Sequence, residues 1–237
     1  SEAAAFDPVD GRFIALNEDE AGWIDLTTGA YTTIGSFGDY PLRAEDGGGS
    51  ETIEDVDGVA YDPITGTWYG FERIEDEPDR MFIFDLSLAP GDLLVTGAFD
   101  GADYVRVQPP QGDSDLVDID DATFEPRSGR LLAIANYGES ATRIVLVNPG
   151  TGDTTDLGTV RFDPDGPGLL GPDTPAVDME GLGSSATGMI AGVTGDTGFL
   201  FELEILPGEV RGHLIRRVLD ADQLWDIESL SCNTRPV

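Results

Sequence analysis

Lysine is absent from this chain of 237 residues, so all 13 basic residues are arginines, and they face 46 acidic residues. The formal net charge of −33 makes nucleic acid an unexpected partner, because phosphate binding requires a basic surface. An anionic membrane surface is excluded for the same reason. This charge destabilises a compact chain unless salt screens it or cations neutralise it. We therefore expect a salt-adapted (halophilic) protein, a calcium-loaded extracellular module, or both.

Cysteine, histidine and long hydrophobic runs are also scarce. Cys232 is the only cysteine, which excludes an internal disulfide. His213 is the only histidine and lies in an expected edge strand, so we expect a surface residue and no catalytic triad. No apolar run approaches the roughly 20 residues of a membrane span, and we expect no membrane insertion. The opening SEAAAFDP lacks the regions of a signal peptide and is typical of a mature or excised domain.

The chain contains a strand-turn-strand pattern that occurs four times. In the first three copies a proline precedes the turn, and in all four a glycine supplies the residue that tolerates positive φ. A third strand and another glycine turn follow each copy. The four copies are AAAFDPVDGRFIAL, GVAYDPITGTWYGF, DATFEPRSGRLLAI and EGLGSSATGMIAGV.

This repeat predicts an all-β fold. Val, Ile, Leu, Phe and Tyr fill the strands, with little helical periodicity. Four strands per unit, recurring roughly every 50 to 63 residues, match the blade of a β-propeller more closely than a β-sandwich. We expect one small β-propeller domain over residues 1–237. Irregular stretches at 38–52, 100–115 and 161–176 would lie between the blades on one face, where a binding surface is expected.

Pairs of carboxylates recur at the start of the inner strands. Side chains two apart on a strand share a face, so propeller symmetry would bring the pairs together around one axis. The first copy lacks a pair, whereas the chain ends on an inner-strand pattern, DIESLSCNTRPV. We therefore predict four blades closed by the N- and C-terminal strands, with five blades as the alternative. The pairs are Asp55 and Asp57, Asp118 and Asp120, Asp178 and Glu180, and Asp226 and Glu228.

A ring of like charges requires a cation, and no arginine lies within the four motifs. Oxygen ligands without His or Cys favour a hard ion, and Ca²⁺ accepts six to eight of them in flexible geometry. All eight carboxylates are thus candidate calcium ligands. The alternative interpretation is that the aspartates cap turns at the strand entries.

These motifs carry a resemblance to known proteins. DVDGVAYDPITG, DMEGL and DIESL resemble the D-x-[DE]-G inner strands of calcium-binding β-propellers, a group that includes SdiA-regulated-type proteins, calcium-activated nucleotidases and propeller phytases. The resemblance implies calcium at the ring. In the enzymes of that group calcium acts on a phosphate together with basic side chains, but this chain has no lysine and no arginine cluster beside the motifs.

Four residues in or next to the inter-blade stretches are predicted to bind a ligand. Aromatic side chains there can stack on a sugar, whereas Trp23 and Trp68 are expected in the core. An arginine near the calcium ion would distinguish an enzyme from a structural module, and Arg43, Arg73 and Arg106 are the candidates. The predicted ligand-binding residues are Tyr40, Tyr104, Arg106 and Trp225.

The sequence thus predicts a calcium-stabilised propeller that acts as a binding or structural module of a larger surface protein. We expect it outside the cell or at the cell surface, as a monomeric domain that binds an unidentified protein or carbohydrate. The alternative function is a calcium-dependent hydrolase of a phosphoester or lactone, with its site at the tunnel mouth.

Overall fold

Three tight turns, each closed by the same hydrogen bond, follow the first strand of three of the repeats, as the sequence predicts. In this computed structural model the Gly66 amide donates to the Asp62 carbonyl at 2.8 Å, and the Gly129 amide donates to the Glu125 carbonyl at 2.9 Å. Both glycines have positive φ, 75° and 68°, a conformation that glycine adopts without steric cost. The structure describes residues 3–7, 11–75, 77–110, 118–136, 141–162, 179–195, 198–217 and 230.

The strands form four antiparallel units, each made from consecutive segments. Unit 1 contains β1 (Ala3–Asp7), β2 (Arg12–Asn17), β3 (Glu20–Ile24) and β4 (Tyr31–Ser36). Unit 2 contains β7 (Val56–Asp62), β8 (Thr67–Glu72), β9 (Arg80–Phe84) and β10 (Tyr104–Arg106). Unit 3 contains β11 (Asp118–Phe124), β12 (Leu131–Asn136), β13 (Arg143–Val147) and β14 (Thr154–Phe162). Unit 4 contains β15 (Met179–Ser184), β16 (Ile190–Thr194), β17 (Phe199–Leu206) and β18 (Glu209–Arg217).

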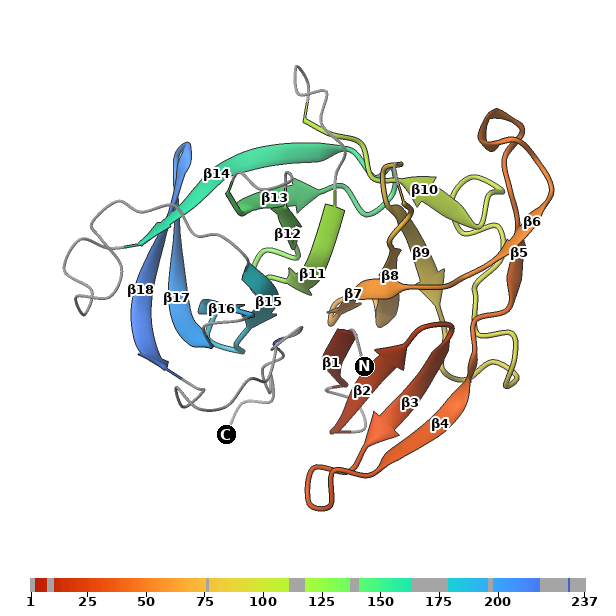
Figure 1. Ribbon diagram of the computed structural model, residues 1–237, viewed down its shortest axis with the longest axis horizontal. Coiled ribbons are helices and arrows are strands. Elements are labelled where there is room, and N and C mark those ends of the chain that lie inside the picture. The colour runs from red at the N-terminus through yellow and green to blue at the C-terminus, as the bar shows by residue number, and fades with distance from the viewer. Residues whose placement is uncertain are drawn as a thin grey trace.

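The first strand of every unit faces a common centre. Figure 1 shows β1, β7, β11 and β15 as the innermost strands, and each is adjacent to the next along the chain. Apolar side chains fill the spaces between neighbouring units, forming one core between units 1 and 2, one between units 2 and 3, and one between units 3 and 4. This packing of sheet faces is propeller-like, and the predicted all-β architecture is confirmed.

The outer strands do not all remain separate. β14 and β18 pair in parallel, Val160 opposite Val210, and join units 3 and 4 into one eight-stranded sheet. The sequence does not predict this pairing, because it joins the outer edges of two repeats. It protects two strand edges that would otherwise be open.

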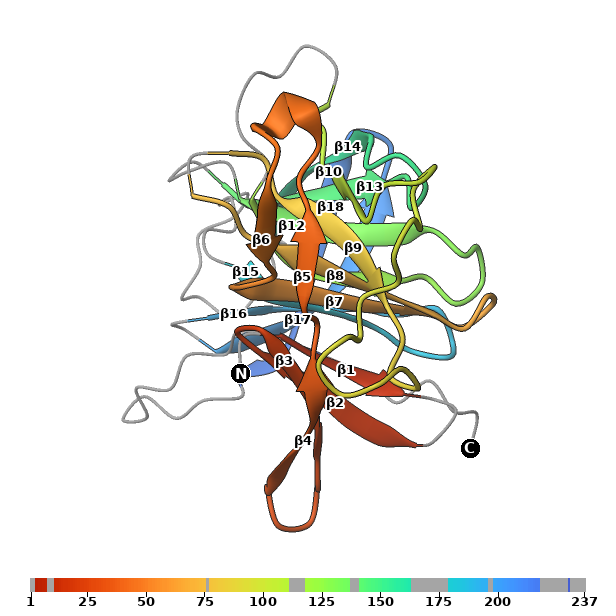
Figure 2. The same ribbon diagram turned by 90° about the vertical axis from the view of Figure 1, so that its right-hand side faces the viewer.

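Two of the stretches predicted as irregular contain strands. Residues 104–106 pair with β9 as the outer strand of unit 2, with Tyr104 opposite Phe82. Residues 38–52 contain β5 (Asp39–Pro41), the 3-10 helix η1 (Ala44–Asp46) and β6 (Ser50–Thr52). The β5–β6 hairpin runs along the outside of unit 2 up to η1 (Figure 2). Long-range packing decides both elements, since the local sequence carries weak strand signals.

Closure of the ring by the C-terminal strand stays a prediction. Unit 1 takes all four of its strands from residues 3–36. Of the predicted C-terminal strand only Leu230 is described, and it lines a pocket together with Ala4 of β1 and Leu182 of β15. Leu230 thus lies near the first and the last inner strand.

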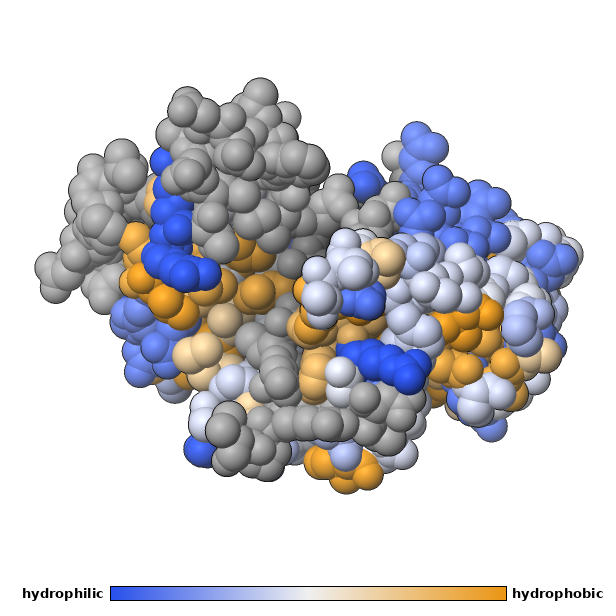
Figure 3. All heavy atoms as spheres, turned by 90° about the horizontal axis from the view of Figure 1, so that it is seen from below, coloured by the Kyte–Doolittle hydropathy of each residue, from blue (hydrophilic) through white to orange (hydrophobic). Residues whose placement is uncertain are grey.

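In the view from below, the hydrophobic residues among those described form separate patches with hydrophilic residues between them (Figure 3). Within the described part of the chain, no helix has the length and apolar character needed to cross a membrane.

Candidate functional site

Three inner strands carry a β-bulge at the same position. In β7, Val56 pairs with Glu72 and Gly58 with Phe71, which leaves Asp57 as the extra residue. A bulge bends the strand and re-aims the side chain of its extra residue. The pairing shifts in the same way in β11 and β15. The residues at the three bulges are Asp57, Asp120 and Glu180.

Asp120 lies at the centre of the resulting acidic cluster. Burial raises the pKa of its carboxyl well above the ordinary value, and four neighbouring carboxylates raise it further. One neutral donor, Asn136 Nδ2, bonds the Asp120 carboxylate, while Thr142 Oγ1 donates to Asn136 Oδ1 at 2.9 Å. The neighbours that raise the pKa are, in order of effect, Asp118, Asp57, Glu180 and Asp79. These five residues are called the acidic centre below.

Of the three arginines that the sequence offered as candidates, Arg73 lies beside the acidic centre. Its NH1 is 3.9 Å from Asp57 Oδ2 and its Nε is 3.9 Å from Asp118 Oδ1. The residue follows β8, and its amide donates to the Asp55 carbonyl at 3.0 Å, so the β7–β8 hairpin returns it to the start of β7. The side chain is 55% exposed, and the carboxylate of Asp118 raises the pKa of its guanidinium. A single arginine from outside the four motifs therefore faces the acidic centre.

Two buried aspartates that the motif missed hold the inner strands by hydrogen bonds. Asp79 Oδ2 accepts from the Ile119 amide at 2.6 Å. Asp121 Oδ1 accepts from the Ala122 amide at 2.8 Å, and its Oδ2 accepts from the amides of Leu182 and Leu230 at 2.8 and 3.2 Å. Asp121 thus links unit 3 to unit 4 and to the C-terminal segment, which is the capping role of the alternative interpretation.

The remaining predicted calcium ligands have separate outcomes. Asp55 is exposed, precedes β7 and has a left-handed φ of 52°, so it does not form a same-face strand pair with Asp57. Asp178, Asp226 and Glu228 lie outside the described residues. Among the residues that are described, no three Cys, His, Asp or Glu side chains are close enough together to hold a metal ion.

The two tyrosines predicted to stack on a ligand are buried. Tyr40 and Tyr104 are 2% and 1% exposed, and their rings form an edge contact with centroids 5.2 Å apart. Tyr40 Oη donates to Glu72 Oε2 at 2.6 Å, and the hydroxyl of Tyr104 donates to Asp46. Their ring faces therefore offer no stacking platform to solvent. The β5–β6 hairpin causes this burial.

The other two predicted ligand-binding residues do not form a platform with the tyrosines. Arg106 NH2 pairs with Asp46 Oδ1 at 2.5 Å and with Glu77 Oε2 at 2.7 Å. Trp225 lies outside the described residues.

A buried polar network connects the β5–β6 hairpin to unit 2. Arg80 is 3% exposed, pairs with Glu51 at 2.5 Å and donates to the Tyr40 hydroxyl. Glu72 Oε1 accepts from the Glu54 amide at 3.0 Å. Burial raises the pKa of Glu72 to about 7, although Tyr40, Glu54 and Arg80 act to lower it. The network is structural, since its carboxylates, hydroxyl and guanidinium pair inside the protein, although the buried Nε of Arg80 has no hydrogen-bond partner among the described residues.

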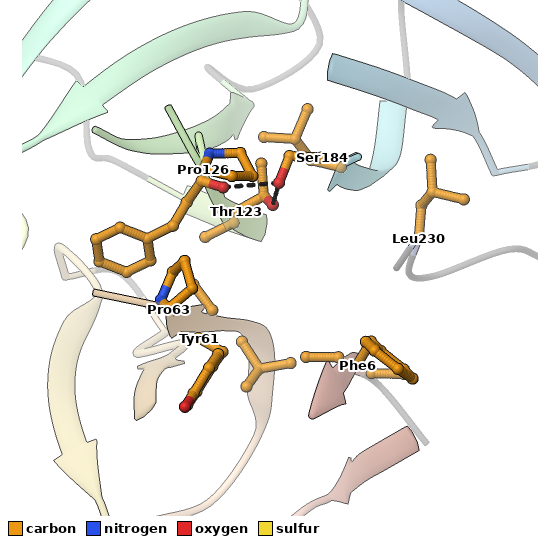
Figure 4. A pocket seen from close by; sticks show the side chains of 14 residues that line it. Phe6, Tyr61, Pro63, Thr123, Pro126, Ser184 and Leu230 are labelled. Carbon is orange, nitrogen blue, oxygen red and sulfur yellow. Dashed lines mark hydrogen bonds between the residues drawn. The ribbon is translucent and has the colours of Figure 1, made fainter. Parts of the chain in front are cut away.

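The opposite ends of the inner strands enclose a small pocket. Figure 4 shows Phe6, Tyr61, Pro63 and Pro126 around a pocket of about 40 Å³, which has room for a few water molecules. Ser184 Oγ donates to the Phe124 carbonyl at 2.6 Å, so the polar group at this end is already satisfied.

Comparisons with known proteins inform the fold only. No family model and no curated protein match the chain. A structural genomics protein of unknown function from Bacteroides thetaiotaomicron matches with a TM-score of 0.53 and 13% identity, over 98% of this chain and 54% of that protein. This likeness shows a shared fold.

Weaker matches include the PQQ-bound form of aldose sugar dehydrogenase from Streptomyces coelicolor, with a TM-score of 0.47 and 18% identity over 87% of this chain and 60% of that one. TolB from Acinetobacter baumannii matches with a TM-score of 0.41 and 14% identity over 90% and 56%. The structural neighbours are β-propeller-like proteins. The chain spans 60% and 54% of the length of the first two proteins it resembles.

Proposed function

We propose that this chain is a propeller-like domain that binds a calcium ion at the acidic centre and is stabilised by it. One observation carries the proposal. The bulge residues Asp57, Asp120 and Glu180, from three neighbouring inner strands, are close enough to interact electrostatically. Burial and like charge both disfavour the ionised form of Asp120, and a bound cation would offset both effects.

The donor chemistry fits calcium. Carboxylate oxygens are hard ligands, and Ca²⁺ takes six to eight of them in a flexible geometry, whereas Mg²⁺ requires a tighter octahedron. The three bulge carboxylates would hold the ion, and it would supply positive charge at the ends of the inner strands. The described carboxylates do not by themselves close into a metal site. The proposal therefore includes further ligands from outside the described residues: Asp178, Asp226 and Glu228.

A structural ion favours the role of a binding or structural module within a larger surface protein. Extracellular modules use calcium sites with dissociation constants of about 10⁻⁴ to 10⁻³ M, which suits a site built from few, partly exposed ligands. The charge of −33 supports the same setting, or a salt-adapted protein, because each supplies cations to an acidic surface. A protein or carbohydrate ligand and a monomeric state belong to this proposal.

The test is the melting temperature in high NaCl after EDTA treatment, compared with the same sample restored with millimolar calcium. A ligand that binds only the folded state at 100 times its dissociation constant stabilises it by about 2.7 kcal/mol. We expect a rise of several degrees with calcium and a smaller rise with magnesium. Equal melting temperatures with and without calcium would reject the calcium site and leave the carboxylates as strand-capping groups.

Hydrolysis is the second candidate function, and Arg73 favours it. Its guanidinium is half exposed beside the acidic centre, where it could hold a phosphoryl or carbonyl oxygen of a substrate near the ion. The side chains of Arg43 and Arg106 bond elsewhere, to the Tyr104 carbonyl and to Asp46.

Assays with p-nitrophenyl phosphate and with γ-butyrolactone, each with calcium and with EDTA, test this candidate. A hydrolase should lose turnover in Arg73→Ala at an unchanged melting temperature. No turnover of either substrate by the calcium-loaded protein would reject hydrolysis of these two classes without affecting the calcium site.

A further inference from the structure

A larger pocket lies away from the acidic centre, between units 1 and 2. It has a volume of about 520 Å³, which is the size of a small-molecule site. Its walls come from β1, β3, from β7 to β9 and from the segment after β9. Tyr61, near the last residue of β7, lines it, whereas Asp57 is near the first residue of that strand. The pocket is thus at the other end of β7 and is independent of the proposed calcium site.

Aromatic rings form much of the wall. Trp23, Tyr61 and Trp68 line the pocket, and the first two are half-buried. The Tyr61 and Trp68 rings are 4.6 Å apart at an angle of 46°, and Trp68 stacks on Phe84 at 5.7 Å. Trp68 is only 6% exposed and contacts the Tyr61 and Phe84 rings, so packing against the core holds this wall in place. The two tryptophans that the sequence assigned to the core therefore contribute to a pocket.

The pocket is also negatively charged. Asp7 and Asp85 line it, and Asp7 is only 6% exposed. Burial raises the pKa of the Tyr61 hydroxyl, and the carboxylates of Asp7 and Asp62 raise it further. None of the described lining residues is basic, although the guanidinium of Arg12 lies against the Trp23 ring. An anionic ligand is therefore disfavoured here.

The protein already places a cation on one of these rings. The guanidinium carbon of Arg12 lies 5.2 Å from the centre of the Trp23 ring. Aromatic faces attract cations, most strongly where water is excluded, and rings grouped beside carboxylates are the known means of binding quaternary ammonium groups. The carboxylates accept hydrogen bonds and donate none when ionised, so they match a cation better than they match the mixed donors and acceptors of a sugar.

We infer that this pocket binds an organic cation, namely a methylated ammonium group such as the head group of choline. The methyl groups contact the faces of Trp23, Tyr61 and Trp68, and the positive charge lies near Asp7 and Asp85. A quaternary ammonium group has no N–H to donate. The carboxylates would therefore balance its positive charge without forming a hydrogen bond to it. This binding activity adds to the proposed calcium function and does not depend on it.

Isothermal titration calorimetry of the protein with choline, at constant ionic strength, tests the inference. The control ligand is 3,3-dimethylbutan-1-ol, which has the shape of choline without its charge. We expect saturable choline binding that is at least about tenfold tighter than binding of the neutral alcohol. Equal affinity for the two ligands, or no choline binding, would overturn the inference. Binding of glucose but not of choline would identify a carbohydrate site in its place.

Matched variants locate the site. Trp23→Leu and Asp85→Asn should each weaken choline binding about tenfold. Tyr31→Leu and Asp92→Asn change an exposed aromatic residue and an exposed aspartate that do not line the pocket, and should leave binding unchanged. The melting temperature of each variant confirms that it is folded. Equal loss in the controls and in the pocket variants would also overturn the inference.

Discussion

Arg73 Nε lies 3.9 Å from Asp118 Oδ1, so a guanidinium from the β7–β8 hairpin faces a carboxylate from β11. The same side chain reaches Asp57 at 3.9 Å. The acidic centre therefore has a partial internal counter-ion, which competes with any bound cation. Because the guanidinium is half exposed, solvent screens this attraction and the arginine can move aside.

Replacing Arg73 by glutamine should strengthen calcium binding several-fold, because it removes a positive charge next to the proposed ion. Calorimetric titration of the variant with calcium measures the change. Arg216→Gln removes an exposed arginine on β18 and serves as the control. An unchanged affinity in Arg73→Gln would mean that the ion binds elsewhere.

Asp120→Asn should abolish most of the calcium-dependent rise in melting temperature. Without calcium the same variant should be as stable as the natural protein or more stable, because it removes one of several clustered buried charges. Melting curves with EDTA and with calcium give both results. Asp92→Asn, at an exposed position, is the matched control. A variant that retains the full calcium effect contradicts the site.

The stability of the protein should depend on the ionisation of Glu72. Its pKa rises from an ordinary 4.5 to about 7 in the folded state, so the folded state binds the proton more tightly than the unfolded state. This contribution to the free energy of unfolding falls as pH rises from about 4.5 to about 7 and then levels off. Urea unfolding between pH 5 and pH 8 should show a smaller fall in Glu72→Gln. If the free energy of unfolding fell more steeply with pH in Glu72→Gln than in the natural protein, the raised pKa of Glu72 would be disproved.

Tyr40→Phe should destabilise the protein by about 1 to 3 kcal/mol, because it removes the hydroxyl that donates to the buried Glu72 carboxylate and accepts from Arg80. Urea unfolding measures the loss. Tyr31→Phe alters an exposed tyrosine and should cost less than about 0.5 kcal/mol. Similar losses in the two variants would show that the Tyr40 hydroxyl does not stabilise the hairpin.

Gly152→Ala should destabilise far more than Gly29→Ala. Both glycines have positive φ, 75° and 71°, so both variants carry a backbone cost of roughly 1 kcal/mol. At Gly152 a Cβ atom would also collide with the Arg106 carbonyl, whereas at Gly29 it meets nothing within 4 Å. The difference between their unfolding free energies isolates the contact between units 2 and 3. Equal losses would refute that contact.

Local chemistry made the hairpins predictable. The turn at Gly66 depends on a few consecutive residues, and the same signal recurs at Gly129, so the sequence is sufficient to place the first two strands of these repeats. The position of Asp57 and Asp120 near the starts of inner strands was also predictable, because the motif recurs at the same place in the repeat. Their bulges were not, because a bulge is defined by the partner strand.

The environment of a side chain was less predictable. Tyr40 and Tyr104 were expected at the surface and are buried, because the β5–β6 hairpin packs against unit 2. Trp23 was expected in the core and packs against it, but it is only half-buried and also lines a pocket. In both cases the deciding contact comes from residues distant in the chain.

The sequence by itself determined the charge, the all-β character and the repeated hairpins, since these follow from composition, side-chain alternation and turn chemistry over a few residues. Only the tertiary structure decided that Arg73 lies beside the acidic centre, that β14 pairs with β18, and that an aromatic, acidic pocket forms between units 1 and 2. The physical reason is that these features arise from packing between units, and such packing depends on the shapes of whole sheets.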